Sequence, residues 1–348
     1  MKSTTTIGID IAKGTFHLCG ANAEGRVLWR KKLPRSKVLN FMANIKADVV
    51  GMEACSGAHY WGRELEKLGH QVKLMPPQYS RAYAKTNKDD WVDAEACAEA
   101  VTRPSMRFVP VKSEAHQELQ HLHRVRERRI KARTGLVNQV HGMLLEFGVP
   151  LSKSVDKFTR NVTLAMEQYA ERLSPKMMEL LRELLEEFRL IDQEVDKSTA
   201  AICREHKANP ESQRLDQILG VGTLTATAVV TCIGNPARFE NGRAFSAFLG
   251  LVPKHTGTGG VIKLGGISKR GNPYVRKLLI EGAQAVLAHP RIGNNKHDTW
   301  LRQLIKRRGR NRAAVALANK NARIMWALLT KGENFDRDKA HTPLKKAA

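Results

Sequence analysis

The sequence predicts an α/β domain at the N-terminus, then a long helical segment and a mainly α-helical C-terminal domain. Three patterns support this division. Short β-branched strands alternate with helices over residues 1–112. Two long helical periodicities fill residues 113–208, and shorter helices separated by glycine-rich turns fill residues 209–330. Residues 331–348 are polar and charged, which predicts a disordered basic tail.

The first domain is predicted to contain a mixed sheet covered on both faces, because its apolar strands alternate with helices. Ser36 is expected to cap the first helix, which then runs to about Ile45. Asp10 ends the first strand and Glu53 ends the fourth; if these strands are neighbours, the two acids meet where ligands collect in such sheets. The predicted strands are 4 to about 10, 16–21, 26–33, 48–53 and 71–75, with a further helix at 59–68.

A second pair of acids lies on a helix predicted over residues 90–100. Asp90 and Asp93 are three positions apart, so both carboxylates leave the same face. One interpretation is a solvated first turn, in which Asp89 and Asp90 favour the positive end of the helix dipole. The other joins Asp90 and Asp93 to Asp10 and Glu53 in one pocket, where four carboxylates repel unless their pKa values rise or cations bind. Oxygen ligands select hard ions such as Mg²⁺, and two such ions clamp a phosphodiester, so the pattern favours phosphoryl transfer on nucleic acid.

The charge of the chain also indicates nucleic acid. The 348 residues carry a net charge of +24, and an excess of this size calls for a polyanionic partner. No apolar run reaches the length of a membrane span, and the N-terminus does not resemble a signal peptide, so a cytoplasmic protein without membrane association is expected. The five cysteines are far apart, which favours reduced thiols over a zinc site or disulfides.

The middle segment is predicted to form two long helices. The first, at about 113–147, is rich in arginine and has few acids nearby in the sequence, so a phosphate-facing surface is favoured over a merely solvated face. The second, at about 175–206, carries a heptad seam, and a coiled coil of this kind needs an opposing helix from the same chain or from a second subunit. The arginines predicted to contact nucleic acid are Arg124, Arg126, Arg128, Arg129 and Arg133.

The C-terminal domain is expected to begin near Asn209-Pro210 and to contain two glycine-rich motifs. Residues 218–226 resemble a helix-hairpin-helix turn, whose amides would approach a phosphate, although an ordinary tight turn fits as well. Residues 249–272 combine glycines, threonines and bases, either as a cradle for DNA phosphates or as a flexible hairpin. The basic residues predicted to bind nucleic acid here are Lys254, Lys269, Arg270 and Arg276.

Several motifs together resemble one family. They are Ile7-Gly8-Ile9-Asp10-Ile11-Ala12-Lys13, Glu53, Asn87-Lys88-x-Asp90-x-x-Asp93-Ala94, Arg103-Pro104 and Phe108-Val109-Pro110-Val111-Lys112. They are similar to the RuvC-like DEDD transposases of the insertion-sequence one-ten family, and most of all to its eleven-eleven branch. The resemblance covers nearly the whole chain. It implies an RNase H-like first domain in which Asp10, Glu53, Asp90 and Asp93 are catalytic and bind Mg²⁺, with two ions per site.

The glycine-rich loop resembles the second signature of this family, in which a serine before glycine is the nucleophile that attacks DNA. Thr258 occupies that place here, and Val261 stands where lysine is frequent. Threonine carries the same hydroxyl, but its β-methyl adds crowding, and Thr256 and Ser268 are alternative nucleophiles. The resemblance implies a DNA transposase or site-specific recombinase that is guided by a structured RNA of the element and works as a dimer or tetramer on paired DNA.

Three other functions fit parts of the sequence. A RuvC-like junction-resolving nuclease would use the same acids with metal-activated water and would need no hydroxyl nucleophile. The stretch from Ile7 to Thr15 also resembles the first phosphate loop of actin-like ATPases and sugar kinases, but no matching second loop follows. An architectural DNA-binding protein would explain the charge and leave the clustered acids unexplained.

Overall fold

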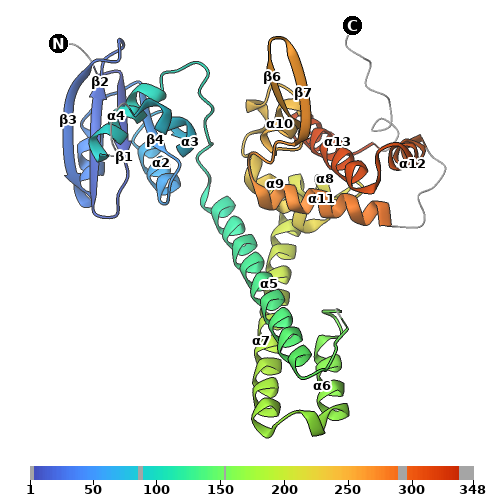
Figure 1. Ribbon diagram of the computed structural model, residues 1–348. Coiled ribbons are helices and arrows are strands. Elements are labelled where there is room, and N and C mark those ends of the chain that lie inside the picture. Colours follow the sequence, from blue (N-terminus) through green and yellow to red (C-terminus); the bar gives the residue numbers. More distant parts are fainter. Residues whose placement is uncertain (1–3, 85–88, 153, 289–295, 337–348) are drawn as a thin grey trace. The chain divides into compact units, whose positions relative to one another are not determined.

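The computed structural model describes residues 4–84, 89–152, 154–288 and 296–336 (Figure 1). The chain separates into two compact units that divide between Gln117 and Glu118, near the start of helix α5 (Glu114–Glu146). The predicted motif residues Asn87 and Lys88, and the tail beyond residue 336, lie outside the described residues. Among the described helices, none is both long enough and apolar enough to cross a membrane.

The first unit is built on a five-stranded mixed sheet in the order β3-β2-β1-β4-β5. The first three strands form an antiparallel meander, whereas β4 and β5 continue the sheet in parallel from β1. The predicted mixed sheet and the adjacency of the first and fourth strands are therefore confirmed. The strands are β1 (Thr6–Asp10), β2 (Thr15–Ala21), β3 (Val27–Pro34), β4 (Val49–Glu53) and β5 (Val72–Met75).

Both faces of this sheet are covered. Ile7 and Ile9 pack on one face with apolar residues of α1 (Val38–Ala43) and α2 (Ala58–Lys67). Because side chains alternate along a strand, Gly8 and Asp10 belong to the other face, over which α4 (Asp90–Ala100) lies. The bounds of α4 agree with the predicted helix. Two short elements, α3 (Pro77–Ser80) and η2 (Arg81–Tyr83), join β5 to the segment before α4.

The predicted cap at Ser36 is wrong. Ser36 lies inside a 3₁₀ turn, η1 (Arg35–Lys37), and α1 begins after Lys37 without a side-chain cap. The preceding Pro34 has an extended backbone and sets the direction of this turn. The helix is therefore shorter than the sequence predicts and ends at Ala43.

Helix α4 packs unusually close to the sheet. A Cβ atom at Gly8 would lie 2.0 Å from the carbonyl oxygen of Ala94, and one at Gly51 would lie 2.8 Å from that of Cys97. Gly8 and Gly51 are neighbours across β1 and β4. Two glycines under an alanine-rich helix thus let the helix backbone rest directly on the strands, which brings its first turn to the ends of β1 and β4.

The second unit begins with a helical bundle that buries the predicted seam. Helices α5, α6 (Phe158–Gln168) and α7 (Pro175–Ala208) share one apolar core. The seam therefore finds its partners in the same chain, in α5 and in α6, a helix that the sequence analysis missed. The sequence spacing predicts the seam at Met177, Leu181, Leu184, Phe188, Ile191, Val195 and Ile202. Leu185, which lies outside this seam, is buried in the core, whereas Leu184 is half-buried, so the apolar stripe is broader than one heptad line.

The remaining helices of the second unit share a separate core, and a β-hairpin of β6 (Pro253–Thr258) and β7 (Val261–Ile267) extends from it. Asn209, where the C-terminal domain was predicted to begin, caps the first of these helices by accepting a hydrogen bond from Ser212 N. The helices are α8 (Pro210–Asp216), α9 (Thr223–Ile233), α10 (Gly242–Phe248), α11 (Pro273–Ala288), α12 (Lys296–Arg308) and α13 (Arg310–Lys331).

The predicted helix-hairpin-helix turn is a tight turn between α8 and α9. Gly220 has a φ of +83°, and a Cβ there would lie 2.8 Å from Val286 and 3.0 Å from the carbonyl oxygen of Gly282. Glycine is needed here for close packing on α11, which explains the motif without a phosphate. Gly222 faces open space at the N-terminus of α9.

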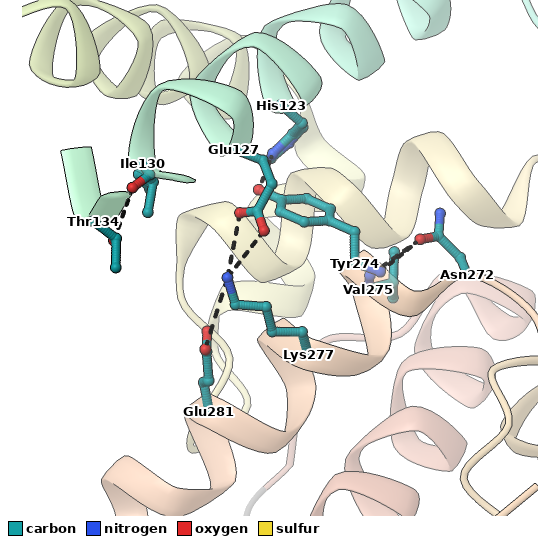
Figure 2. Close-up of polar contacts among 9 residues, drawn as sticks. All are labelled: His123, Glu127, Ile130, Thr134, Asn272, Tyr274, Val275, Lys277 and Glu281. Atoms are coloured by element: carbon teal, nitrogen blue, oxygen red, sulfur yellow. Dashed lines mark hydrogen bonds and ion pairs between the residues drawn. The ribbon is translucent and has the colours of Figure 1, made fainter. Parts of the chain in front are cut away.

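A buried histidine fastens α5 to the C-terminal helices (Figure 2). His123 Nδ1 lies 3.0 Å from Tyr274 Oη, and Nε2 lies 3.0 Å from Thr227 Oγ1. The Thr227 hydroxyl already donates to the carbonyl of Thr223, so it accepts from Nε2–H, and Nδ1 accepts from Tyr274. This requires a neutral imidazole. Burial, helped by Arg126, accordingly lowers the pKa of His123 to about 4.

An ion pair lies beside this network on the same two helices. Lys277 Nζ of α11 is 3.1 Å from Glu127 Oε1 of α5, one helical turn beyond His123 (Figure 2). Glu281 lies 4.0 Å from the same ammonium group. These groups are partly exposed, so the pair adds orientation more than stability.

The close packing of α4 predicts that Gly8→Ala removes this helix from the sheet. The new methyl group would meet backbone, which cannot move aside as a side chain does, so we expect a loss of at least about 2 kcal/mol. Hydrogen exchange should show α4 amides losing protection first. Gly14→Ala is the matched control, since nothing lies within 4 Å of a Cβ there. Equal protection in both variants would contradict this account.

The neutral state of His123 predicts a pH-dependent stability. Its pKa is about 6.5 when unfolded and about 4 when folded, so its contribution is complete above pH 6.5 and is lost as the pH falls toward 4. We expect about 2 kcal/mol of loss between pH 7 and pH 4.5, measured by urea unfolding. In His123→Gln this slope should flatten, whereas His121→Gln, an exposed change on the same helix, should follow the unmodified chain.

Candidate functional site

The four predicted acids come from three elements at one end of the sheet. Asp10 ends β1 and Glu53 ends β4, and these strands are parallel neighbours. Asp90 and Asp93 lie in the first turn of α4, which rests on both strands. By alternation, Asp10 and Glu53 share the face of Gly8 and Gly51, which is the face under α4. Asp90 is exposed, and the other three are half-buried.

The electrostatics of Asp10 reflect this crowding. Burial, then the charges of Asp90 and Asp93, raise its pKa to about 6, with Glu53 adding a smaller effect and His17 opposing it. Cys97, buried behind the acids, has its pKa raised well above the usual range by burial and by the same negative field. The negative charge of this site therefore exceeds what the protein itself neutralises, which is the situation that a divalent cation relieves.

Two of the neighbouring polar groups have structural partners. Ser80 Oγ, at the end of α3, donates to Glu53 Oε2 over 3.2 Å and so orients that carboxylate. Asp89 caps α4, accepting from Trp91 N over 3.1 Å. Asp89 is exposed at the N-terminus of α4, which agrees with the interpretation of a solvated first turn for this residue.

His17 belongs to this site and was missed from the sequence. It lies opposite Asp10 in the β1–β2 register and is only 5% exposed. Its Nδ1 lies 3.5 Å from Asp90 Oδ2. Potential ligand atoms of Asp10, His17 and Asp90 all lie within 4.8 Å of one another, so these residues fit a divalent cation. The alternation of Thr15–Ala21, which places His17 and Cys19 on the face opposite Phe16 and Leu18, is the sequence signal that could have revealed it.

The basic helix has a different environment from the one expected. The prediction assumed few acids to pair its arginines, and this is wrong for two of them: Arg129 pairs with Glu194 and Arg133 with Asp192, both on α7. Arg126 likewise donates to Thr199 Oγ1 over 2.7 Å. These three arginines hold α5 to α7, because the antiparallel pairing brings two acids and Thr199 of α7 beside them. Arg124 and Arg128 are exposed.

The glycine-rich loop forms a β-hairpin with an exposed tip. Thr258 pairs with Val261 across the turn made by Gly259 and Gly260, both at positive φ. All residues of β6 are exposed, including Lys254, Thr256 and Thr258. Both threonine hydroxyls are thus accessible from solvent.

The base of the hairpin is clamped by close backbone contacts. A Cβ at Gly250 would lie 2.2 Å from the Arg270 carbonyl oxygen, and one at Gly271 would lie 1.9 Å from that of Phe248. Lys269 adopts a left-handed backbone, with φ of +55°, beside them. The side chains of Lys269 and Arg270 are exposed at this base.

Two predicted residues of this region have internal roles. Arg276 is 9% exposed and donates to the carbonyls of Leu249 and Arg270, so its predicted contact with nucleic acid is replaced by a support of the hairpin base. Ser268 Oγ is buried and has no hydrogen-bond partner among the described residues. Its burial removes Ser268 as a solvent-accessible nucleophile.

Comparisons with known proteins agree with this architecture. Residues 7–149 match a DEDD transposase model named for IS110, and residues 212–298 match the Transposase IS116/IS110/IS902 family. The chain is 41% identical over 335 residues to the transposase for insertion sequence element IS1111A of Coxiella burnetii, covering 96% of this chain and 92% of that protein.

Two other relatives are similar over comparable lengths. A probable family 20 transposase of Pseudomonas aeruginosa is 44% identical, covering 93% of this chain and 96% of the relative. The transposase for insertion sequence element IS1328 of Yersinia enterocolitica is 37% identical, covering 97% and 100%. The matches to both family models and to these relatives define a DEDD-type transposase, an enzyme that acts on DNA. The chain belongs to the IS110 family of transposases.

The raised pKa of Asp10 predicts that its ionised carboxylate lowers the free energy of unfolding of the metal-free protein. An unfolded carboxyl near 3.8 and a folded one near 6 mean that stability falls as the pH rises through this window. Asp10→Asn should therefore stabilise the protein in EDTA at pH 8 by about 1 kcal/mol, allowing for partial exposure. Urea unfolding measures this. The surface change Asp48→Asn should give no gain, and an Asp10→Asn variant less stable than the unmodified chain would refute the electrostatic account.

Proposed function

We propose that this transposase cuts and rejoins DNA strands of an insertion sequence through a DEDD metal centre and a hydroxyl nucleophile. Asp10, Glu53, Asp90 and Asp93 would hold two Mg²⁺ ions. The observation that carries this proposal is their convergence from two strand ends and one helix turn, under the packing that Gly8 and Gly51 permit.

The fold of the first unit supports the metal assignment. We infer that it is RNase H-like, because an antiparallel meander extended by two parallel strands in the order β3-β2-β1-β4-β5 matches what the family resemblance implies. Acids at the ends of β1 and β4 then occupy the edge of the sheet where ligands collect. Mg²⁺ held there would offset negative charge on a scissile phosphodiester and would stabilise its attacking and leaving oxygens.

Thr258 is the proposed nucleophile. Its Oγ would lose a proton and form a bond to a DNA phosphorus, while the phosphorus–oxygen bond to the departing strand breaks and leaves a free hydroxyl. Thr258 is exposed beside a two-glycine turn, which supports this role because no packed side chains would block a DNA duplex from reaching it. Thr256 is exposed on the same strand and remains the alternative.

The exposed basic side chains would bind the nucleic-acid backbone. Lys254 lies on β6, and Lys269 and Arg270 follow β7 at the base of the hairpin; all three are exposed and would offset charge on the phosphate. Arg124 and Arg128 on α5 offer a second contact with a nucleic-acid backbone. A structured guide RNA and a dimeric or tetrameric synaptic complex are proposed from the family resemblance alone.

A junction-resolving nuclease is the second candidate. It is favoured by one observation: all four acids belong to the first unit, which thus contains a potential metal centre without help from the hairpin. Such an enzyme would hydrolyse DNA with water and would leave Thr258 without a chemical role.

The two functions predict different products. In cells carrying a plasmid with the element, Asp10→Ala and Asp93→Ala should reduce excision by at least about 10³-fold, because the developing charge loses its stabilisation. Thr258→Ala should reduce it equally and should abolish a denaturation-resistant protein–DNA adduct, whereas Thr258→Ser should retain both. Thr256→Ala should retain excision and the adduct, whereas loss of both in this variant alone would assign the nucleophile to Thr256. Persistent excision without an adduct in Thr258→Ala would favour the nuclease.

A further inference from the structure

One buried group at the acidic site lacks an internal role. The His17 imidazole is 5% exposed, and its Nδ1 has no hydrogen-bond partner among the described residues. A buried polar nitrogen without a partner costs about 1–3 kcal/mol. Because the His17 Nδ1 atom faces carboxylates and has no partner, it indicates that a group from outside the protein binds to this nitrogen.

The geometry limits what that group is. Nδ1 of His17 lies 3.5 Å from Asp90 Oδ2, and together with an oxygen of Asp10 these atoms lie within 4.8 Å of one another. Ligand atoms about 2.1 Å from a shared ion are at most about 4.2 Å apart, so closure by a few tenths of an ångström is enough. Asp90 lies on an exposed first turn, where such a movement is easy.

The imidazole is also held in orientation. Its strand position opposite Asp10 fixes the backbone, and the ring of Trp91 packs on it edge to face, with 4.6 Å between centroids. Trp91 is the residue after Asp90, so the same turn of α4 supplies both an oxygen ligand and the packing. A preorganised ring of this kind is typical of a ligand rather than of a chance neighbour.

We infer that His17 Nδ1 is a direct ligand of the metal centre, giving it a mixed oxygen and nitrogen ligand set. This inference rests on the proposed function of the acidic site. Imidazole nitrogen binds Mn²⁺ and later transition metals better than Mg²⁺, which prefers oxygen. The site therefore selects Mn²⁺ over Mg²⁺ more strongly than four carboxylates alone would, and one of the two ion positions differs chemically from the other.

The test measures coordination directly and does not depend on DNA cleavage. Full-length protein is loaded with Mn²⁺, and pulsed electron paramagnetic resonance records coupling to ¹⁴N. We expect imidazole coupling in the unmodified chain and a change to ¹⁵N coupling when histidine is ¹⁵N-labelled. This part needs no variant, so misfolding cannot obscure it.

Variants then assign the nitrogen. His17→Gln, which offers oxygen in place of nitrogen, should lose the coupling and weaken Mn²⁺ binding by at least about tenfold, with less than about threefold effect on Mg²⁺. His70→Gln is the matched control. His70 is also buried in the first unit, but its Nε2 lies 3.0 Å from the Met42 carbonyl oxygen, and it precedes β5 at the opposite edge of the sheet.

The outcomes separate this inference from the proposed function. Mn²⁺ binding that depends on Asp10 but shows no ¹⁴N coupling would overturn the role of His17 and leave the acidic centre intact. Coupling that survives in His17→Gln would also overturn it. Mn²⁺ binding that is insensitive to Asp10→Asn would contradict both.

Discussion

The structure of the first unit depends on how closely α4 approaches the sheet. Gly8 and Gly51 leave the strand backbones bare, and the helix rests its own carbonyl oxygens against them. No ordinary side-chain layer would place the first turn of α4 so near the strand ends. Packing therefore opposes charge repulsion. Close van der Waals contact between α4 and the sheet holds the carboxylates of the acidic site near one another, although their charges repel.

The second unit follows a different rule, in which polar groups fix how long helices meet. Arg129 and Arg133 pair with acids of α7, and neutral His123 joins α5 to α9 and α11. Apolar surfaces alone permit several registers between long helices, whereas paired charges and directional hydrogen bonds favour one. Charge in this chain thus also fixes how α5 and α7 pack against each other.

Much of the first unit could be predicted from local patterns, because its strands and α4 carry strong periodicity and the parallel neighbours follow from strand order. The site was predictable where an acid ends a strand or repeats along a helix, as for Asp10 and Asp93. His17 was missed because its significance depends on cross-strand register. The pairing of Arg129 with Glu194 and the burial of Arg276 were missed because they depend on tertiary contacts between distant segments.

The length of the hairpin amplifies small rotations at its base into larger displacements of its tip. Its strand from Pro253 to Thr258 extends about 17 Å, so a rotation of about 10° at the base displaces the tip by about 3 Å. Chemistry at a phosphodiester is sensitive to errors of about 1 Å. The position of the proposed nucleophile, the Thr258 hydroxyl, would therefore be set by groups far from it, namely the backbone contacts of Gly250 and Gly271 and the guanidinium of Arg276.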